Sequence, residues 1–447
     1  MPHPTHAEAT YVFLHSPSEA PDARMIALQV PEFEWYGERA LLLARDSDLV
    51  GVAHPVDERY LRYLHALGIG PRFENVFMVE GVEPGRGLSE RLSEDSASLE
   101  RLARQLRKSA CIVLSPFFGT SASVAVGNAL GALLGRSVEV VGGPPELVRQ
   151  VHEKRFAREL AQSLGIPVAP GDVVTIPSPS DRRPGDLDDL RRSIERRAAT
   201  TGRVIVRGSS GASGSSTFTL LPDDVDGVVD AIGQRTDNTV YLVEPFFEAT
   251  ISPNVEVVID PGRAVHPKVA VTDQILSPEL VYLGSTYPSS ARRKTDMVSD
   301  SLAIVDWMRS RGFSGRIGFD FVEHDRGDDG GAGYFLTEIN PRVNGASYPV
   351  ALIARLTAAK GRVGAPAPAA FRTSNVGVAV RDFNGLEALC RSLLYDPERG
   401  EGVVPYTVGA LPVGKVGVAC FGDSPSRVEE LFAEFVSLVR PLETAAP

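Results

Sequence analysis

One segment of this chain predicts two neighbouring β-strands that carry acidic residues on a shared face. Residues 315–323 (GRIGFDFVE) and 334–340 (YFLTEIN) have the composition of strands, and the polar, glycine-rich segment HDRGDDGGAG between them is a strong hairpin signal. With the turn centred in that segment, antiparallel pairing puts Asp320 opposite Glu338. Because side chains alternate between the two faces of a strand, Asn340 falls on the face of Glu338. The spacing therefore brings two carboxylates and one amide oxygen together.

This set of oxygen atoms has the chemistry of a magnesium site. Mg²⁺ prefers a few carboxylates together with nucleotide phosphates and water to a cage made wholly of protein. The next residues, Pro341 and Arg342, add a guanidinium that can contact a phosphate. The alternative is a solvent-facing strand pair with ordinary acidic residues. We interpret the segment as the metal and phosphate end of a nucleotide site.

Length, charge and cysteine content restrict the class of protein. A chain of 447 residues predicts two or three domains. The net charge of −11, without a run of lysine or arginine, argues against a nucleic-acid partner and favours small molecules or peptides. No apolar run reaches the ~18 residues of a membrane span, and the N-terminus lacks the features of a signal peptide. With three widely spaced cysteines, we expect a soluble cytoplasmic protein with reduced thiols.

The order of predicted elements indicates a mixed α/β and α+β multidomain protein. Residues 10–150 alternate short apolar strands with amphipathic helices, which predicts an N-terminal α/β domain. The turn at residues 115–123 follows a strand and precedes a helix, where open α/β sheets bind ligands, although a plain turn is an alternative. Residues 358–370 (AAKGRVGAPAPAA) read as a linker, and residues 371–447 as a small C-terminal α/β unit.

Two segments in the middle of the chain suit a nucleotide. Residues 208–217 (GSSGASGSST) follow a strand, and small residues let the backbone approach phosphates, although a flexible linker is an alternative. Arg207, which ends that strand, supplies a permanent positive charge. Residues 241–247 (YLVEPFF) form a strand that ends in two aromatic residues and could offer adenine an apolar slot, although these residues could equally fill a core.

Taken in order, these elements resemble the ATP-grasp superfamily. The resemblance rests on a lysine-bearing helix before Gly-Ile-Pro-Val, a strand into a small-residue loop, a Val-Glu hinge, an aspartate strand and the sequence EINPR, and it covers residues 150–355. It implies a pre-ATP-grasp domain at residues 1–148 and an ATP-grasp domain at residues 149–357. The latter would consist of two α+β subdomains, at residues 149–243 and 244–357.

The resemblance also implies roles for individual residues, with ATP and Mg²⁺ as the cofactors. Asp320, Glu338 and Asn340 match the metal ligands, and Arg342 matches the arginine that steadies the transferred phosphoryl group. Lys268 is a further catalytic candidate near the γ-phosphate, with a surface lysine as the alternative. The matching ATP-binding positions are Lys154, Arg207, Ser209, Ser210, Gly211, Ser213, Gly214, Ser215, Ser216, Glu244, Pro245, Phe246, Phe247, Asn254 and Glu256. Arg207 departs from the usual lysine. Arg292 and Arg293 are candidates for a substrate carboxylate, with a solvated helix start as the alternative.

The implied reaction is ATP-dependent amide formation. A substrate carboxylate would attack the γ-phosphate to give an acylphosphate and ADP, and an amine would then displace phosphate. The whole-chain layout is similar to the peptide ligases of pheganomycin-type biosynthesis, which implies a guanidino or amidino amino acid joined to the N-terminus of a peptide. Another ATP-grasp ligase, such as a dipeptide ligase or a carboxylase, and a non-catalytic ATP-binding module stay open as alternatives. The oligomeric state is a separate question, for which a homodimer also stays open.

Overall fold

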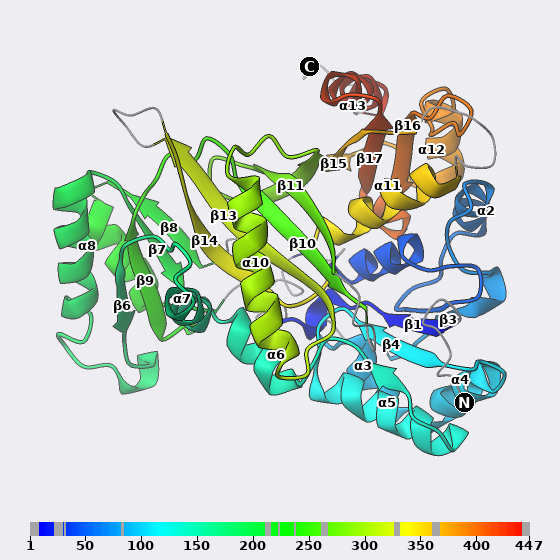
Figure 1. Cartoon of the computed structure of the whole chain (residues 1–447), viewed down its shortest axis with the longest axis horizontal. Helices are drawn as coiled ribbons and strands as arrows, with labels where there is room; N and C mark the ends of the chain where they lie inside the picture. The colour runs from blue at the N-terminus through cyan, green and yellow to red at the C-terminus, as the bar shows by residue number, and fades with distance from the viewer. Residues whose placement is uncertain are drawn as a thin grey trace, which may run out of the picture.

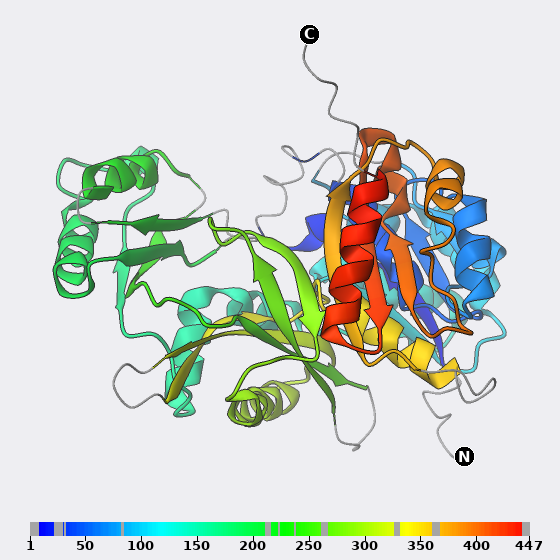
Figure 2. The same cartoon turned by 90° about the horizontal axis from the view of Figure 1, so that it is seen from above.

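The strands in the described part of the chain form three sheets, and helices pack against these sheets (Figures 1 and 2). The computed structural model describes residues 9–21, 30, 33–81, 85–210, 216–221, 224–236, 238–260, 267–325, 331–359 and 367–439. No helix in these ranges is long and apolar enough to cross a membrane. The mixed α/β and α+β architecture expected from the sequence is confirmed.

The N-terminal region is a parallel α/β domain. Its five strands lie in the order β3-β2-β1-β4-β5 and pair in parallel. Val12 and Leu14 of β1 are fully buried, as expected for a strand with both neighbours in place and apolar cover. The elements are β1 (Thr10–Leu14), η3 (Phe33–Leu42), β2 (Leu49–Val52), α2 (Glu58–Ala66), β3 (Val76–Met78), α3 (Leu88–Glu94), α4 (Ser96–Leu106), β4 (Ile112–Pro116), α5 (Ser121–Leu134) and β5 (Glu139–Val140).

A four-stranded antiparallel sheet follows, in the order β6-β9-β7-β8. Its strands are β6 (Asp172–Thr175), β7 (Val204–Gly208), β8 (Thr217–Leu220) and β9 (Val240–Pro245). The helices α8 (Asp188–Thr201) and α9 (Val225–Gly233) share its apolar core, to which Ile194 and Ile232 contribute fully buried side chains. This unit lies at the left of Figure 1.

The third sheet has eight strands, in the order β14-β13-β10-β11-β12-β15-β17-β16. Its first five strands are β10 (Pro253–Ile259), β11 (Lys268–Leu276), β12 (Tyr282–Tyr287), β13 (Gly315–Asp325) and β14 (Ala332–Asn340). The helices α6 (Pro145–His152), α7 (Lys154–Ser163) and α10 (Lys294–Arg309) pack on β10, β13 and β14, where Met297 and Phe319 are fully buried. This core positions the predicted hairpin.

The C-terminal strands extend that same sheet. They are β15 (Ala370–Gly377), β16 (Gly402–Tyr406) and β17 (Lys415–Gly422), with α12 (Phe383–Cys390), η9 (Val408–Val413) and α13 (Pro425–Val439) beside them. Their core also includes residues of the N-terminal domain and of α11 (Ser347–Ala359). The buried carboxylate of Glu38 accepts hydrogen bonds from the backbone N–H groups of Val408 and Gly409, which ties η3 to η9. The domain boundaries stay predictions.

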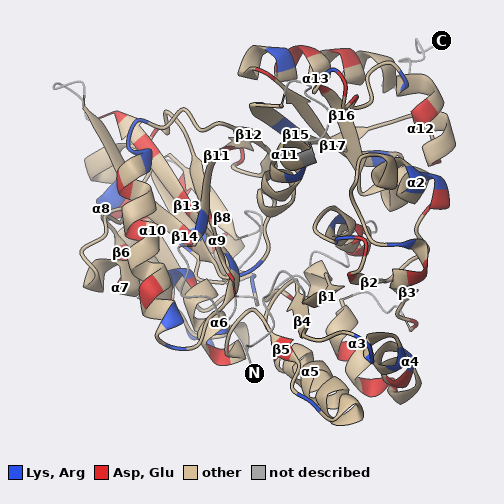
Figure 3. Cartoon of the chain, turned by 45° about the vertical axis from the view of Figure 1, so that its right-hand side comes forward, with Lys and Arg blue, Asp and Glu red and all other residues tan. Residues whose placement is uncertain are grey.

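Acidic and basic residues are interspersed along surface helices such as α4 and α13 (Figure 3). Arg427, near the start of α13, forms ion pairs with Glu430 in the same helix and with Glu401 just before β16. These contacts fix the C-terminal helix against the segment that leads into the edge strand. Exposed pairs of this kind stabilise a fold only slightly.

Candidate active site

The hairpin of β13 and β14 places the predicted oxygen atoms together. Asp320 pairs with Glu338 across the hairpin and Gly318 pairs with Asn340, so the predicted register is confirmed. A β-bulge follows Asp320, next to the pairing of Phe321 with Leu336. The Asn340 amide donates to Asp320 Oδ2 at 2.9 Å, which shows that the two side chains share a face.

The surroundings shift the pKa values of the two carboxylates in opposite directions. Burial, reinforced by the charge of Glu338, raises the pKa of Asp320 to about 7. Burial also acts to raise the pKa of Glu338, but Lys154 and other cationic neighbours outweigh it and hold that pKa below its ordinary value. Lys154 Nζ lies 3.4 Å from Glu338 Oε1, with only 9% of the lysine side chain exposed. Two adjacent half-buried carboxylates that repel each other form a site that a divalent cation would stabilise.

Neighbouring strands complete the surroundings of Asp320. Asn254 on β10 donates to Asp320 Oδ1 at 2.6 Å, and Gln274 on β11 donates to the same oxygen at 2.7 Å. Asn254 Oδ1 is buried without a hydrogen-bond partner, so it is a further oxygen atom available to a ligand. Within the described ranges no group of three or more His, Cys, Asp and Glu side chains could hold a metal ion. A cation here would therefore depend on the two carboxylates, amide oxygens and nucleotide phosphates, as Mg²⁺ does.

A cavity of about 810 Å³ lies beside this carboxylate pair, between the four-stranded and the eight-stranded sheets. Its size suits a ligand as large as a nucleotide. The structure thus brings together predicted residues from segments almost two hundred positions apart. Those that line the cavity are Lys154, Arg207, Ser216, Glu244, Pro245, Phe246, Phe247, Asp320 and Glu338.

Arg207 is held by a buried carboxylate within this cavity. Its Nη2 lies 2.6 Å from Glu244 Oε2, and its Nη1 donates to the backbone oxygen of Thr337 at 3.0 Å. The other oxygen of Glu244 accepts from Arg158 Nη1 at 2.8 Å, a partner on α7 that the sequence did not indicate. Two guanidiniums therefore occupy the Glu244 carboxylate.

The small-residue loop is anchored at both of its described ends. The Ser210 N–H donates to Asn238 Oδ1 at 2.7 Å, and Asn238 Nδ2 donates to Ser216 Oγ at 3.1 Å. The carbonyl oxygen of Ser209 accepts from the Lys154 N–H at 2.9 Å, which links the loop to the start of α7. Gly211, Ser213, Gly214 and Ser215 lie outside the described residues.

Two residues predicted to bind ATP have other neighbours. Glu256 is fully buried and accepts hydrogen bonds from Asn344 Nδ2 at 3.1 Å and Ser347 Oγ at 2.7 Å. Gly318 lies opposite it on β13, and its missing side chain leaves room for the Asn344 amide. Glu256 therefore supports the start of α11 and does not line the cavity of about 810 Å³. Asn254 donates to Asp320 and does not line the cavity of about 810 Å³, and its ribose contact stays a prediction.

Lys268 and Arg292 lie outside the cavity of about 810 Å³. The side chain of Lys268 is 77% exposed, its Nζ is 3.5 Å from Asp260 Oδ2, and it lines a different cavity. Arg292 is paired with Glu323 and Asp325, so its charge is already compensated. Neither a γ-phosphate contact by Lys268 nor a substrate contact by Arg292 fits this placement.

Arg293 has a similar structural role. Its Nε lies 2.6 Å from Asp296 Oδ2, and its Nη1 donates to the backbone oxygen of Ala332 at 3.0 Å. It therefore fastens the start of α10 to β14. Like Arg292, it lines neither the cavity of about 810 Å³ nor the cavity that Lys268 lines. The alternative of a solvated helix start is closer to what the structure shows, although both arginines are engaged with the hairpin.

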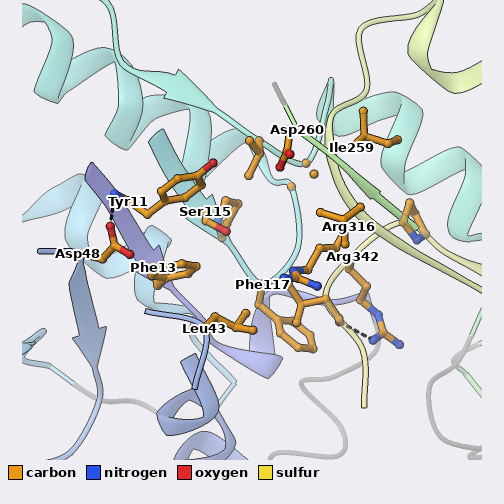
Figure 4. A pocket seen from close by; sticks show the side chains of 18 of the residues that line it. Tyr11, Phe13, Leu43, Asp48, Ser115, Phe117, Ile259, Asp260, Arg316 and Arg342 are labelled. Carbon is orange, nitrogen blue, oxygen red and sulfur yellow. Dashed lines mark hydrogen bonds between the residues drawn. The ribbon is translucent and has the colours of Figure 1, made fainter. Parts of the chain in front are cut away.

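Arg342 connects the carboxylate pair to a second, smaller cavity of about 380 Å³ (Figure 4). Its Nη2 donates to Asn340 Oδ1 at 2.9 Å and its Nη1 to the backbone oxygen of Val343 at 3.0 Å. The guanidinium lies 5.5 Å from the centre of the Phe117 ring, in the turn after β4 that the sequence singled out. Its Nε is buried without a partner. A ligand group that bridges the two cavities would meet this charge.

Comparisons with known proteins agree with this architecture. Two family models match parts of the chain, the Pre ATP-grasp domain over residues 37–132 and the PGM1 C-terminal domain over residues 390–433. No curated protein sequence matches.

Solved structures resemble the chain over nearly its whole length. An N5-carboxyaminoimidazole synthetase from Staphylococcus aureus complexed with ADP has 12% identity and a TM-score of 0.52, with coverage of 95% of this chain and 97% of that one. The carboxyaminoimidazole ribonucleotide synthase from Aspergillus clavatus with ATP has 14% identity and a TM-score of 0.52, covering 97% and 100%. Biotin carboxylase from Campylobacter jejuni has 12% identity and a TM-score of 0.54, covering 98% and 93%. At this identity the likeness shows the fold alone: an N-terminal α/β domain, which the Pre ATP-grasp model matches over residues 37–132, followed by the two antiparallel sheets.

Proposed function

We propose that this protein is an ATP-dependent carboxylate-amine ligase. One observation carries the proposal: Lys154, Arg207 and the Asp320/Glu338 pair converge on one cavity of nucleotide size, and Arg342 leads from that pair into a second cavity. A phosphate-binding end adjoining a second binding space is what transfer of a phosphoryl group to an acid requires. The fold supports the proposal, since ATP and ADP complexes are known for proteins of similar architecture.

The chain's own residues would act mainly by positioning and by charge. Lys154 and Arg207 would hold the phosphates, and Glu244 would keep the Arg207 guanidinium oriented toward them. Mg²⁺ held by Asp320, Glu338 and Asn340 would neutralise charge on the phosphates. Arg342 would orient the attacking carboxylate and then stabilise the anionic tetrahedral adduct formed with the amine. Each turnover would release ADP and phosphate.

The finer proposal is a peptide ligase of natural-product, that is antibiotic, biosynthesis. It is supported by the sequence resemblance, which implies a guanidino or amidino acid as one partner and a peptide amine as the other. A carboxylase is a second candidate, because all three structures described above have a carboxy or carboxylase term in their names. A cytoplasmic location and a homodimer stay part of the proposal.

Hydroxylamine trapping separates these activities. The protein is incubated with ATP, Mg²⁺, hydroxylamine and a panel of acids, and the formation of hydroxamate and ADP is measured. An activated acid gives a hydroxamate and one ADP per product. ADP formation that depends on bicarbonate alone would favour the carboxylase, AMP as the product would contradict the acylphosphate route, and ATP binding without turnover would favour a non-catalytic module.

A further inference from the structure

The smaller cavity lies between the N-terminal sheet and the large sheet, next to Arg342. It is lined by one face of β1, by the turn after β4, and by the ends of β10 and β13. Figure 4 shows Tyr11 and Phe13 on one side and Arg316 and Arg342 on the other. The rings of Tyr11 and Phe13 are stacked with centroids 5.8 Å apart. An aromatic wall thus faces two guanidiniums.

The charges in this cavity favour a carboxylate. Arg342 has a buried Nε without a partner, and its described contacts are to an amide and a backbone oxygen. Arg316 is paired on one side only, where its Nη1 lies 3.2 Å from Glu256 Oε1. Arg355 lines the cavity as well, and its hydrogen bonds go to the backbone oxygens of Leu43 and Ala44. Two arginines, Arg342 and Arg355, therefore have no carboxylate hydrogen-bonded to them within the described ranges.

The acidic residues of the cavity already have cationic partners. Asp48 is buried and accepts from Arg45 Nη2 at 2.8 Å and from the Tyr11 N–H at 3.0 Å. Asp260 is paired with Lys268 at 3.5 Å. A positively charged side chain entering the cavity would find both carboxylates in ion pairs and would add to an excess of positive charge. Burying such a group without a partner is costly.

We infer that the acid substrate has an uncharged aromatic side chain. Its carboxylate would lie against Arg342 and Arg316, and its ring would lie against Tyr11, Phe13 and Phe117. This inference rests on the proposed ligase function, and it names a substrate class that differs from the cationic acid implied by the sequence resemblance. A volume of about 380 Å³ is sufficient for an aryl amino acid.

The test compares acids that differ mainly in side-chain charge. KM values are measured by hydroxamate formation with phenylglycine, phenylalanine, arginine, glutamate and alanine. The lowest KM for the aryl acids supports the inference. The lowest KM for arginine, for glutamate or for alanine overturns it and leaves the ligase function in place. No hydroxamate from any of these acids, or from a wider panel, would remove the proposed function and the inference with it.

Variants locate the site. Tyr11→Leu should raise the KM for the aryl acid by about 2- to 10-fold, the loss expected for one aromatic contact, with the KM for ATP unchanged. Phe73→Leu is the matched control, since Phe73 lies in the same domain, is 53% exposed and lies outside the cavity. Asp260→Asn should leave arginine a poor substrate. An unchanged aryl-acid KM in Tyr11→Leu, with a folded protein by circular dichroism, would overturn the placement.

Discussion

Replacing Glu244 with glutamine should strongly destabilise the chain. The Glu244 side chain is 3% exposed and lies between Arg158 and Arg207, whose side chains are 10% and 11% exposed. Glutamine keeps the shape but removes the charge, so two buried guanidiniums lose their counterion. Removing one partner of a buried ion pair costs about 3 to 5 kcal/mol. Because two arginines share this carboxylate, we expect a loss of stability within that range.

The assay is thermal and denaturant unfolding of the nucleotide-free protein. Glu248→Gln is the matched control, because the Glu248 side chain is 82% exposed and Arg203 is its only ion-pair partner among the described residues. The control should change the unfolding transition little, since exposed ion pairs contribute little. A loss below about 1 kcal/mol in Glu244→Gln would refute the argument that this carboxylate holds two buried charges. With ATP added, the variant should also bind nucleotide more weakly, because Arg207 loses the group that orients it.

Three further variants test other parts of the account. Glu338→Gln should abolish ADP formation and leave the circular dichroism spectrum unchanged; normal turnover would exclude Glu338 as a metal ligand. Asn254→Ala removes the donor to Asp320 and should raise the Mg²⁺ concentration needed for half-maximal ADP formation by about 10- to 100-fold, and an unchanged titration would count against it. Burial raises the pKa of Glu19 to about 8, so the folded chain keeps a proton that the unfolded chain loses above about pH 4.5. Stability should therefore fall between pH 5 and 8. Because the raised pKa values of Asp320 and Glu38 add to the same fall, Glu19→Gln should make it smaller without abolishing it in pH-dependent melting; an identical pH profile would contradict this.

Local pairing explains why the sequence predicted the hairpin register so well. The two strands are joined by a short turn. The position of the turn's centre and the two-residue alternation of a strand are therefore enough to pair Asp320 with Glu338. Asn254 and Glu256 are two residues apart on β10 and so lie on one face of the strand, but the sequence could not show which residues each would contact. Asn254 meets Asp320, whereas Glu256 meets α11 across the gap at Gly318.

Contacts between distant segments escaped sequence reasoning. Arg158 and Gln274 are ordinary polar residues in their own helix and strand, and only the packing of α7 and β11 brings them to Glu244 and Asp320. Likewise, the C-terminal strands look like a separate unit in sequence, yet β15 pairs with β12 and extends the large sheet. The smaller cavity is lined by residues of the N-terminal sheet and of the eight-stranded sheet, so no single segment of the sequence indicates it.

The most direct measurement of the central claim is a crystal structure with a non-hydrolysable ATP analogue and Mg²⁺. The account predicts the triphosphate between the four-stranded and eight-stranded sheets, with Lys154 and Arg207 on the phosphates. It also predicts a metal ion bound by Asp320 and Glu338. A nucleotide bound elsewhere, or a metal ion that contacts neither carboxylate, would contradict it.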